Sequence, residues 1–347
     1  MTELHLFRPT AEQRELASSA EAVFAAATRA GVRASDGAGP GPGWRLLADS
    51  GFLGALLPEE RGGLGLLPSD LVLLTEEAGR ILLAGPVVET LWIGAPALDA
   101  LDGAGAGELD RVLAGADWCS AVDETLRGPD LDTAAVVAVP GPAGDVVLTA
   151  EALGGLEPVP TADRLERSSR APDLDVGAGR SLPPLAGVGV LALGRLGGAA
   201  HLLGVTRWLL DTSVTYATDR TQFGVPIGSF QAVRHRLADV HVELEFARSA
   251  VWSAACEVEA GAASARTAVV CAAVAARRAF ALADRTALQV HAGIGMTWEH
   301  PLHVHVKRGH TLASRFGTGR TLAHHLGEQL LAEAASAPRS EPPHPSI

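Results

Sequence analysis

Two polar segments in the C-terminal half of the chain carry side chains that suit a phosphate-bearing ligand. The first segment contains the guanidinium of Arg220, and the second contains Gln289 followed by Gly293. A guanidinium presents paired donors to phosphate oxygens, and glycine allows close approach of the backbone. Such residues are also common at ordinary helix ends, so the two segments indicate a binding site only when they are taken together.

A third segment is rich in histidine and raises the question of a metal site. Its histidines are His300, His303, His305 and His310. A spacing of two residues suits a strand better than one face of a helix, and no thiol ligand lies nearby. We therefore predict no metal centre and expect exposed or interface histidines.

The run from Gly187 to Ala192 matches the relaxed GxGxxA dinucleotide fingerprint. That fingerprint requires a preceding strand and a βαβ unit, and neither is indicated here. The run therefore predicts the start of a helix near Pro183 and Pro184, in which small residues allow close packing.

Composition and charge narrow the class of protein. With 347 residues, 47% of them hydrophobic, the chain can bury the cores of two or three domains. Its 40 acidic and 28 basic residues give a net charge of -12. This excess of acid disfavours a nucleic-acid or anionic-membrane partner and favours a soluble protein with a small-molecule substrate.

The cysteines and the apolar runs indicate the compartment. Cys119, Cys256 and Cys271 are widely spaced without a CxxC pair, so we expect neither a disulfide framework nor a zinc site. A reducing, cytoplasmic location follows. The N-terminus has no basic start followed by an apolar run and predicts no signal peptide. Arg195 and His201 interrupt the longest apolar run, which therefore predicts a buried helix and no membrane span.

Residues 1–115 are predicted to form a helical domain, the first of the elements that position the candidate residues. Apolar residues recur there with helical spacing. Its predicted helices span 12–30, 44–51 and 68–83. Residues 116–182 contain short valine-rich runs and predict a small β domain, with strands at 134–139 and 145–150. Residues 158–175 are expected to be irregular, because they are rich in Pro, Asp and Arg.

The C-terminal part, residues 183–335, predicts long helices with short connections. The predicted helices span 189–219, 229–259, 263–293 and 303–335. Four helices of this length pack naturally as an antiparallel bundle. The tail 336–347 contains four prolines and is expected to be disordered.

Three stretches resemble the acyl-CoA dehydrogenase family. The segment 216–235, YATDRTQFGVPIGSFQAVRH, is similar to the family's helix-turn-helix signature, and 289–297, QVHAGIGMT, to its glutamine and diglycine segment. The glycine-dense loop 58–65, followed by 76–80, is similar to its first domain. The resemblance implies a mainly α acyl-CoA dehydrogenase fold, with an N-terminal helical domain, a reduced middle β domain and a C-terminal four-helix bundle.

In this family each FAD lies at a subunit interface. The resemblance implies that Arg220 pairs with the pyrophosphate of an FAD held by a neighbouring subunit. The residues that would flank Arg220 are Gln222 and Phe223. Those that would lie along the adenosine half of the FAD are Gln289, Ala292 and Gly293.

The family's catalysis requires a glutamate that removes the α-proton of the substrate, and the resemblance gives two places for it. One is Phe316 or Gly317, depending on how the segments are matched, and the other is Gly194. No Asp or Glu occurs from 300 to 327 or from 176 to 210. Since a general base must lie within reach of the proton it removes, we predict that the chain has no catalytic residue of its own.

A chain without the base that keeps the residues facing a neighbour's FAD resembles the shorter subunit of actinobacterial heteromeric steroid-CoA dehydrogenases. The resemblance implies an α2β2 complex with a glutamate-bearing paralogue, in which this chain completes the partner's FAD site. It also implies a steroid side-chain acyl-CoA as substrate and electron-transfer flavoprotein as a further partner. The chain alone is expected to be inactive.

Two alternatives stay open. A self-sufficient homotetrameric dehydrogenase would need a relocated base, such as a histidine or Asp211. A scaffold subunit would bind a partner or acyl-CoA without contacting any flavin. Flavin bound to a complex of one chain type favours the first alternative, whereas flavin content that does not respond to loss of Arg220 favours the second.

Overall fold

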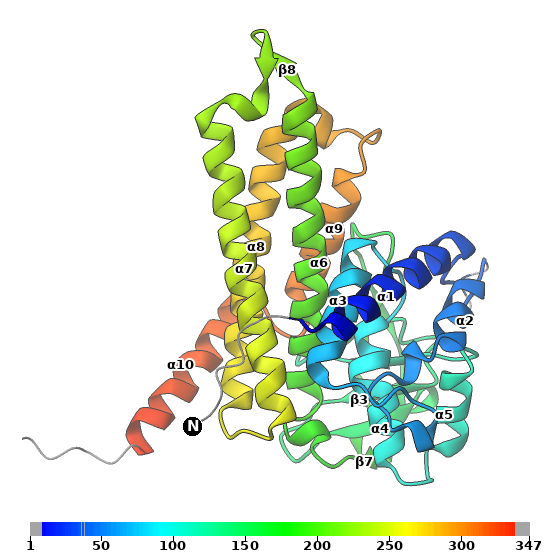
Figure 1. Ribbon diagram of the computed structural model, residues 1–347. Coiled ribbons are helices and arrows are strands. Elements are labelled where there is room, and N and C mark those ends of the chain that lie inside the picture. Colours follow the sequence, from blue (N-terminus) through cyan, green and yellow to red (C-terminus); the bar gives the residue numbers. More distant parts are fainter. Residues whose placement is uncertain (1–8, 36, 38, 337–347) are drawn as a thin grey trace, which may run out of the picture.

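The computed structural model describes residues 9–35, 37 and 39–336. It is mainly helical, as predicted, with a helical N-terminal part, a small β domain and long C-terminal helices (Figure 1). The predicted tail 336–347 lies outside the described residues, apart from Ser336, which ends a helix. Within the described residues, no helix combines the length and apolar character that a bilayer crossing requires.

The described residues of the N-terminal part contain five α-helices and a π-helical segment, besides two 3-10 turns. These are α1 (Ala11–Ala30), α2 (Pro42–Asp49), α3 (Pro68–Arg80), η3 (Glu89–Gly94), α4 (Ala95–Ala100) and α5 (Ala106–Leu113). The first three agree with the predicted helices within a few residues. Helix α1 begins where predicted because Thr10 and Gln13 cap it reciprocally, each side chain accepting from the other's backbone N–H.

The β domain holds two small sheets. The first has the order β1 (Cys119–Ala121), β3 (Val136–Val139), β4 (Val146–Thr149) and β7 (Arg180–Ser181), and the second β2 (Arg127–Pro129), β6 (Ser168–Arg170) and β5 (Glu157–Val159). The two predicted strands are confirmed as the antiparallel pair β3 and β4, in which Ala138 lies opposite Val147.

The expectation of irregular structure over 158–175 is wrong in part, because β6 lies inside this range and β5 ends in it. Both strands have three residues. A strand this short shows no alternation of apolar and polar residues that could be recognised in the sequence.

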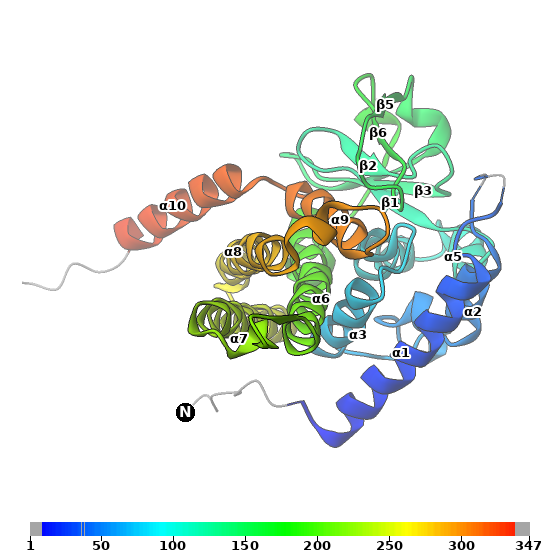
Figure 2. The same cartoon turned by 90° about the horizontal axis from the view of Figure 1, so that it is seen from above.

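The C-terminal part contains α6 (Val190–Asp219), α7 (Gln231–Glu259), α8 (Ala265–His291), α9 (Leu302–Ser314) and α10 (Gly319–Ser336). The first three confirm the predicted helices. The single helix predicted over 303–335 is wrong, because the chain turns after Ser314. Phe316 and Gly317 have φ values of 56° and 117°, which no right-handed helix contains. Helix α10 then points away from the bundle formed by α6 to α9 (Figure 2).

Helix α6 begins directly after the glycines of the GxGxxA run, so the helix start expected there is confirmed. Gly187 and Gly189 have φ values of 72° and 89° and lead into Val190. The Asp145 carboxylate accepts a hydrogen bond from the backbone N–H of Val190 at 2.7 Å. A carboxylate therefore already occupies the position at which a dinucleotide fold would hold a phosphate.

Helices α3 and α6 cross in direct backbone contact, which joins the N-terminal part to the bundle. A Cβ atom on Gly79 would lie 2.0 Å from the carbonyl oxygen of His201, and one on Gly204 would lie 1.8 Å from that of Glu76. Only glycine permits this approach. The crossing fixes α6 against the N-terminal domain along its middle.

Candidate functional site

The two segments singled out as binding candidates lie at the same end of the bundle, at the top of Figure 1. Helix α6 ends at Asp219 and leads into the hairpin of β8 (Thr221–Gln222) and β9 (Val225–Pro226). Helix α8 ends at His291, next to the 3-10 helix Ala292–Met296. The ring of Tyr216 stacks on that of His291, with 4.5 Å between ring centroids. This contact joins the two segments.

Arg220 is held by its backbone and leaves its side chain in solvent. Its N–H donates to the Tyr216 carbonyl at 2.9 Å, and its carbonyl accepts from the Ile227 N–H at 2.8 Å. Within the described part of the chain, no carboxylate forms an ion pair with Arg220. Its guanidinium therefore projects from a fixed backbone with its donors free for an external anion.

The hairpin tip presents an aromatic side chain to solvent. Phe223 is 94% exposed and has a φ of 54°, and Gly224 follows with a φ of 80°. Gln222 donates from its side-chain amide to the carbonyl of Thr221 at 2.8 Å. Phe230, which is 38% exposed, lies beside it with 6.2 Å between ring centroids, and exposed apolar side chains that lie together are typical of a surface that another protein covers.

The second segment is equally open. Gln289 and Ala292 are exposed, and nothing lies within 4 Å of a Cβ atom built on Gly293. Two large apolar side chains beside them, Met296 and Trp298, are 82% and 67% exposed. All six predicted binding residues thus lie on one solvent-facing end of the bundle, among exposed apolar groups.

The two places considered for the missing base meet in space, far from that end. A Cβ atom on Gly194 would lie 2.6 Å from the ring of Phe316, so the phenyl ring fills the space that a side chain at 194 would need. The guanidinium of Arg195 donates to the Phe316 carbonyl at 3.0 Å. No carboxylate belongs to either position.

Arg277 holds the turn that carries Phe316. Its guanidinium donates to three backbone carbonyls of the turn, those of Ala313 at 2.9 Å, Arg315 at 2.8 Å and Gly317 at 3.0 Å. Burial, and then the nearby charge of Arg195, lower the pKa of Arg277 to about 10. The buried cation is satisfied by carbonyl dipoles, which fix the turn and its positive φ values.

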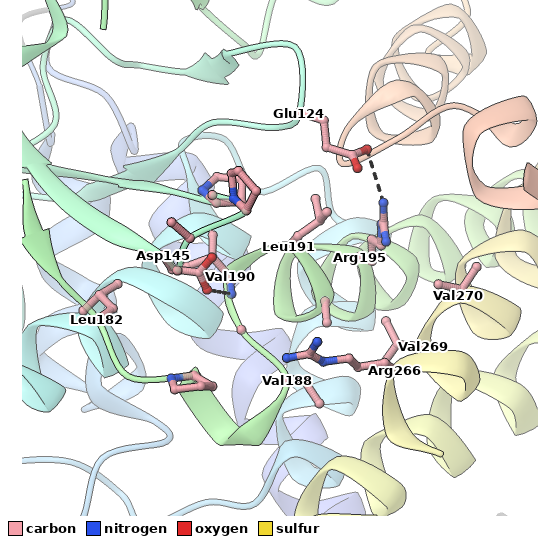
Figure 3. Close-up of a pocket in the computed structure, with 18 of the residues that line it drawn as sticks. Glu124, Asp145, Leu182, Val188, Val190, Leu191, Arg195, Arg266, Val269 and Val270 are labelled. Carbon is pink, nitrogen blue, oxygen red and sulfur yellow. Dashed lines mark hydrogen bonds and ion pairs between the residues drawn. The ribbon is translucent and has the colours of Figure 1, made fainter. Parts of the chain in front are cut away.

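One carboxylate near this place escaped the sequence analysis. Glu124, in the loop after β1, accepts from Arg195 at 3.2 Å (Figure 3). The same guanidinium lies 3.1 Å from Nδ1 of His325 on α10. Burial, opposed by Glu124, lowers the pKa of Arg195. No motif in the sequence marks Glu124, because its relation to Arg195 exists only in the folded chain.

A cavity of about 870 Å³ opens beside Glu124, between the turn 140–144 and the first turns of α6 and α8. We call it the α6 cavity. Its apolar wall includes Leu182, Val188, Leu191, Ala192, Val269 and Val270. Arg266 is exposed and extends from α8 toward the start of α6 (Figure 3). Within the described residues no ion pair involves Arg266, so the cavity combines an apolar wall with a free cation.

Charged side chains fill the contact between the β domain and α9. Arg315 pairs with Glu89 at 2.7 Å and with Glu166, and Arg308 pairs with Asp163 at 3.2 Å and Glu166 at 3.3 Å. All five side chains are buried. A hollow of about 10 Å³, room for one water molecule, lies beside them. This contact leaves no space for a ring system.

The histidine-rich segment is helical as predicted but differs from the expectation in burial. His303, His305 and His310 lie on α9, inside the helix predicted over 303–335. His305 is buried, where exposed or interface histidines were expected; it stacks on Trp208 with 3.3 Å between ring centroids. His310 lies 3.1 Å from Asp284. Burial lowers the pKa of His305 to about 4, so the ring serves packing in its neutral form.

Comparison with known families assigns both helical parts. Residues 10–108 match the acyl-CoA dehydrogenase N-terminal domain, and residues 187–331 match the acyl-CoA dehydrogenase C-terminal domain. The chain belongs to the acyl-CoA dehydrogenase family. The second match spans both the Arg220 hairpin and the Gly194 position. The family resemblance inferred from the motifs is thereby confirmed.

Individual acyl-CoA dehydrogenases extend this assignment. The acyl-CoA dehydrogenase IpdE2 of Mycobacterium tuberculosis is 32% identical over 83% of this chain and 86% of its own length. FadE34 of the same organism is 34% identical over 80% of this chain but 40% of its own length. The steroid ACAD Tcur3481-Tcur3483, as a G363A variant, superposes with a TM-score of 0.80 at 29% identity, covering 94% of this chain and 99% of that chain.

Two further solved structures share the fold. The ChsE4-ChsE5 complex of Mycobacterium tuberculosis gives a TM-score of 0.78 at 23% identity, covering 96% of this chain and 100% of that chain. Butyryl-CoA dehydrogenase of Megasphaera elsdenii gives a TM-score of 0.73 at 19% identity, covering 94% of this chain and 100% of that chain. The fold prediction is thereby confirmed, since the same architecture serves enzymes of this family.

Proposed function

We propose that this chain is the non-catalytic subunit of a heteromeric, FAD-dependent acyl-CoA dehydrogenase and completes the FAD site of a glutamate-bearing partner. One observation carries the proposal. Gly194 and Phe316, the two places considered for the base, are packed against each other without a carboxylate, whereas Arg220 at the opposite end of α6 keeps its guanidinium free. The chain lacks the means to remove a proton and retains the means to bind an anion.

The exposed end of the bundle fits part of an FAD held by another subunit. Arg220 would neutralise the pyrophosphate, and Gln222 and Phe223 would lie beside it. Gln289, with the open backbone at Ala292 and Gly293, would follow the adenosine half. FAD, when bound, accepts the hydride in the family's reaction. The role of this chain is to orient the cofactor and to exclude water from one side of it.

The chain's own β domain does not fit a flavin ring in the same way. Arg315, Glu166 and Glu89 fill the contact between the β domain, α9 and η3 with buried ion pairs. Displacing them would leave buried charges without partners, which costs several kcal/mol. This supports a flavin held by the partner and none held by this chain alone.

The partner and the substrate class follow from the relatives. The solved relatives include a steroid ACAD named as a pair of chains and a complex of ChsE4 with ChsE5. By analogy, the partner is a paralogue that carries the glutamate, and the substrate is an acyl-CoA thioester formed on the side chain of a steroid. Electron-transfer flavoprotein would reoxidise the flavin.

The experiment that tests the proposal counts flavin per chain. We expect the isolated chain to be colourless and inactive, and its complex with a glutamate-bearing paralogue to be yellow and active. Replacing Arg220→Ala removes charge-assisted hydrogen bonds and should weaken flavin retention by about tenfold or more. Arg220→Lys should keep part of the flavin retention. The control Arg320→Ala, at an exposed arginine on α10, should leave flavin retention unchanged. Flavin and dehydrogenation in the isolated chain would contradict the proposal.

A second candidate, a homotetramer with a relocated base, is favoured by one observation. Glu124 is a carboxylate that shares Arg195 with the turn of Phe316. If the isolated chain is yellow and Glu124→Gln abolishes its activity, this second candidate replaces the first.

A further inference from the structure

We propose that His291 is a positioning residue, whose uncharged ring holds the Arg220 hairpin and the segment 289–293 in the relative position that one FAD requires. The inference rests on the proposed function, since it concerns how the two segments are held for the cofactor of a partner subunit. Protonation of the ring, or of His300 beside it, would release the two segments from each other.

His291 lies at the junction of the two segments. It is the last residue of α8 and is 1% exposed. Its ring contacts that of Tyr216 on α6, with 4.5 Å between centroids, and that of His300, with 4.7 Å between centroids. The carbonyl of Tyr216 accepts the N–H of Arg220 at 2.9 Å. The Arg220 side of the site is therefore connected to α8 through the ring of His291.

The 3-10 helix after α8 packs closely over the same histidine. Ala292 directly follows His291 with a φ of 50°, a conformation that few residues other than glycine adopt. A Cβ atom on Gly295 would lie 2.9 Å from the Cβ atom of His291 and 2.9 Å from the side chain of Leu302. The backbone that would follow the adenosine half of FAD thus depends on the position of His291.

The hydrogen bonds of His291 require the neutral ring. Its Nδ1 lies 2.8 Å from the carbonyl oxygen of Ala287, which can only accept, so Nδ1 carries the proton. Within the described residues, Nε2 is buried without a hydrogen-bond partner. A second proton would therefore create a buried charge and a buried donor without an acceptor. Burial lowers the pKa of His291; the bond to Ala287 opposes this shift, and the nearby His300 adds to it.

His300 also requires the neutral form, for a different reason. Its Nδ1 accepts a hydrogen bond from the backbone N–H of Leu302, the first residue of α9, at 3.1 Å. A protonated Nδ1 could not accept this bond, and a positive charge is unfavourable at the N-terminus of a helix. Burial, and then the nearby His303, lower the pKa of His300. The contact between His291 and His300 is thus a contact between two neutral rings.

The surroundings supply no counter-charge for a proton on either ring. Titratable or charged groups near the pair come from three elements: Tyr216 on α6, Glu299 ahead of α9, and His303 and Lys307 on α9. In the part of the chain that the structure describes, no carboxylate forms an ion pair with His291 or His300. Glu299 is exposed, and the Thr297 hydroxyl lowers the pKa of its carboxyl.

The packed arrangement should therefore weaken as the pH falls. In the packed state the pKa of each ring lies below the ordinary histidine value of 6.5, so the released state binds more protons below that pH. At about pH 5.5, each histidine that is charged only in the released state shifts the equilibrium by about tenfold. A complex that depends on this contact is expected to lose flavin in mild acid.

The first measurement uses the isolated chain and needs no cofactor. Tyr216 is the only tyrosine in the sequence, so incorporation of 3-fluorotyrosine gives one fluorine NMR signal, from the ring that lies on His291. We expect this signal to shift over the range below about pH 6.5 in which circular dichroism shows a folded chain. In His291→Phe, which keeps a ring without a titrating group, it should stay in place. A signal that does not move, or that moves equally in His291→Phe, overturns the inference.

The second measurement follows flavin release from the complex with a glutamate-bearing paralogue, by the fluorescence of the freed flavin. His291→Ala should speed release about fivefold even at neutral pH, because the aromatic contacts are lost. His291→Phe should retain flavin and flatten the acid-dependent part of the profile. His300→Asn, whose amide oxygen can still accept from Leu302, should flatten it as well. The control His324→Phe, at an exposed histidine on α10, should keep the profile of the unaltered complex.

The outcomes separate the inference from the proposed function. Release that steepens in mild acid in the unaltered complex and flattens in His291→Phe supports the inference. If His291→Phe does not fold, His300→Asn decides by the same comparison. A complex that holds flavin, with the same pH profile in these variants as in the unaltered form, overturns the inference alone. A complex without flavin at any pH overturns the proposed function, and the inference with it.

Discussion

The ring of Phe316 lies where a side chain at position 194 would have to be, since a Cβ atom on Gly194 would approach it to 2.6 Å. These residues are 122 positions apart in the sequence and mark two different places at which the family's base can be sought. In the folded chain they are one place. A single packing contact therefore accounts for the absence of a carboxylate at both.

A side chain introduced at Gly194 should destabilise the fold. We expect Gly194→Ala to lower the free energy of unfolding by about 1 to 3 kcal/mol, because the added methyl group collides with the Phe316 ring. Adding Phe316→Ala should relieve that collision, so the double-mutant cycle measured by urea unfolding should show coupling. Gly107→Ala is the control, since nothing lies within 4 Å of a Cβ atom there. Additive effects of the two changes would contradict the contact.

Arg277 should matter far more than its neighbour in the sequence. Arg277→Lys loses the planar donor set that reaches three carbonyls, so we expect it to reduce stability by about 2 to 4 kcal/mol. Arg278→Lys changes an exposed pair with Glu243 and should cost about 0.5 kcal/mol or less. Thermal and chemical unfolding of both variants measure the difference. Equal effects would show that the turn does not depend on Arg277.

Stability should depend on pH through His305. Its folded-state pKa is about 4, below the ordinary value of 6.5, because burial disfavours the charged ring. Between pH 6.5 and 4 the unfolded chain binds more protons, so the free energy of unfolding should fall as the pH is lowered through this window. The full loss would be on the order of 3 kcal/mol. His305→Phe, which keeps a ring against Trp208, should flatten this part of the pH profile.

Phe223 should contribute to association and not to folding. It is 94% exposed on the hairpin tip, so Phe223→Ala should leave the free energy of unfolding within about 0.5 kcal/mol of the parent. If the hairpin contacts a partner subunit, the same change should weaken the complex by about tenfold or more, as is usual for a buried aromatic anchor. Val176→Ala, at an exposed apolar residue of the β domain, is the control for the binding measurement.

Much of this fold could be predicted because long helices repeat their apolar pattern many times. Helices α6, α7 and α8 each contain 27 or more residues, and their predicted and observed bounds agree within two residues. The break between α9 and α10 was missed, because apolar residues continue through it. The turn exists because Arg277 binds its carbonyls, and such a tertiary contact leaves no local pattern.

In the candidate site, too, some features could be predicted from the sequence and others could not. The lack of Asp and Glu in the two windows considered for the base could be read directly from the sequence. Glu124 could not be found in this way, because its relation to Arg195 joins residues 71 positions apart. The arrangement of Arg220 and Gln289 at one end of the bundle follows from the antiparallel helices, which the sequence does indicate.

Helix α6 has one further consequence. Its 30 residues make a rod of about 45 Å, with the α6 cavity near one end and Arg220 at the other. The middle of the rod is held against α3 by Gly79 and Gly204, so a substitution near one end has little means of disturbing the other. After duplication of a gene for such a subunit, the two ends can come under separate selection. One copy can lose its chemistry while its surface for the sister chain is preserved.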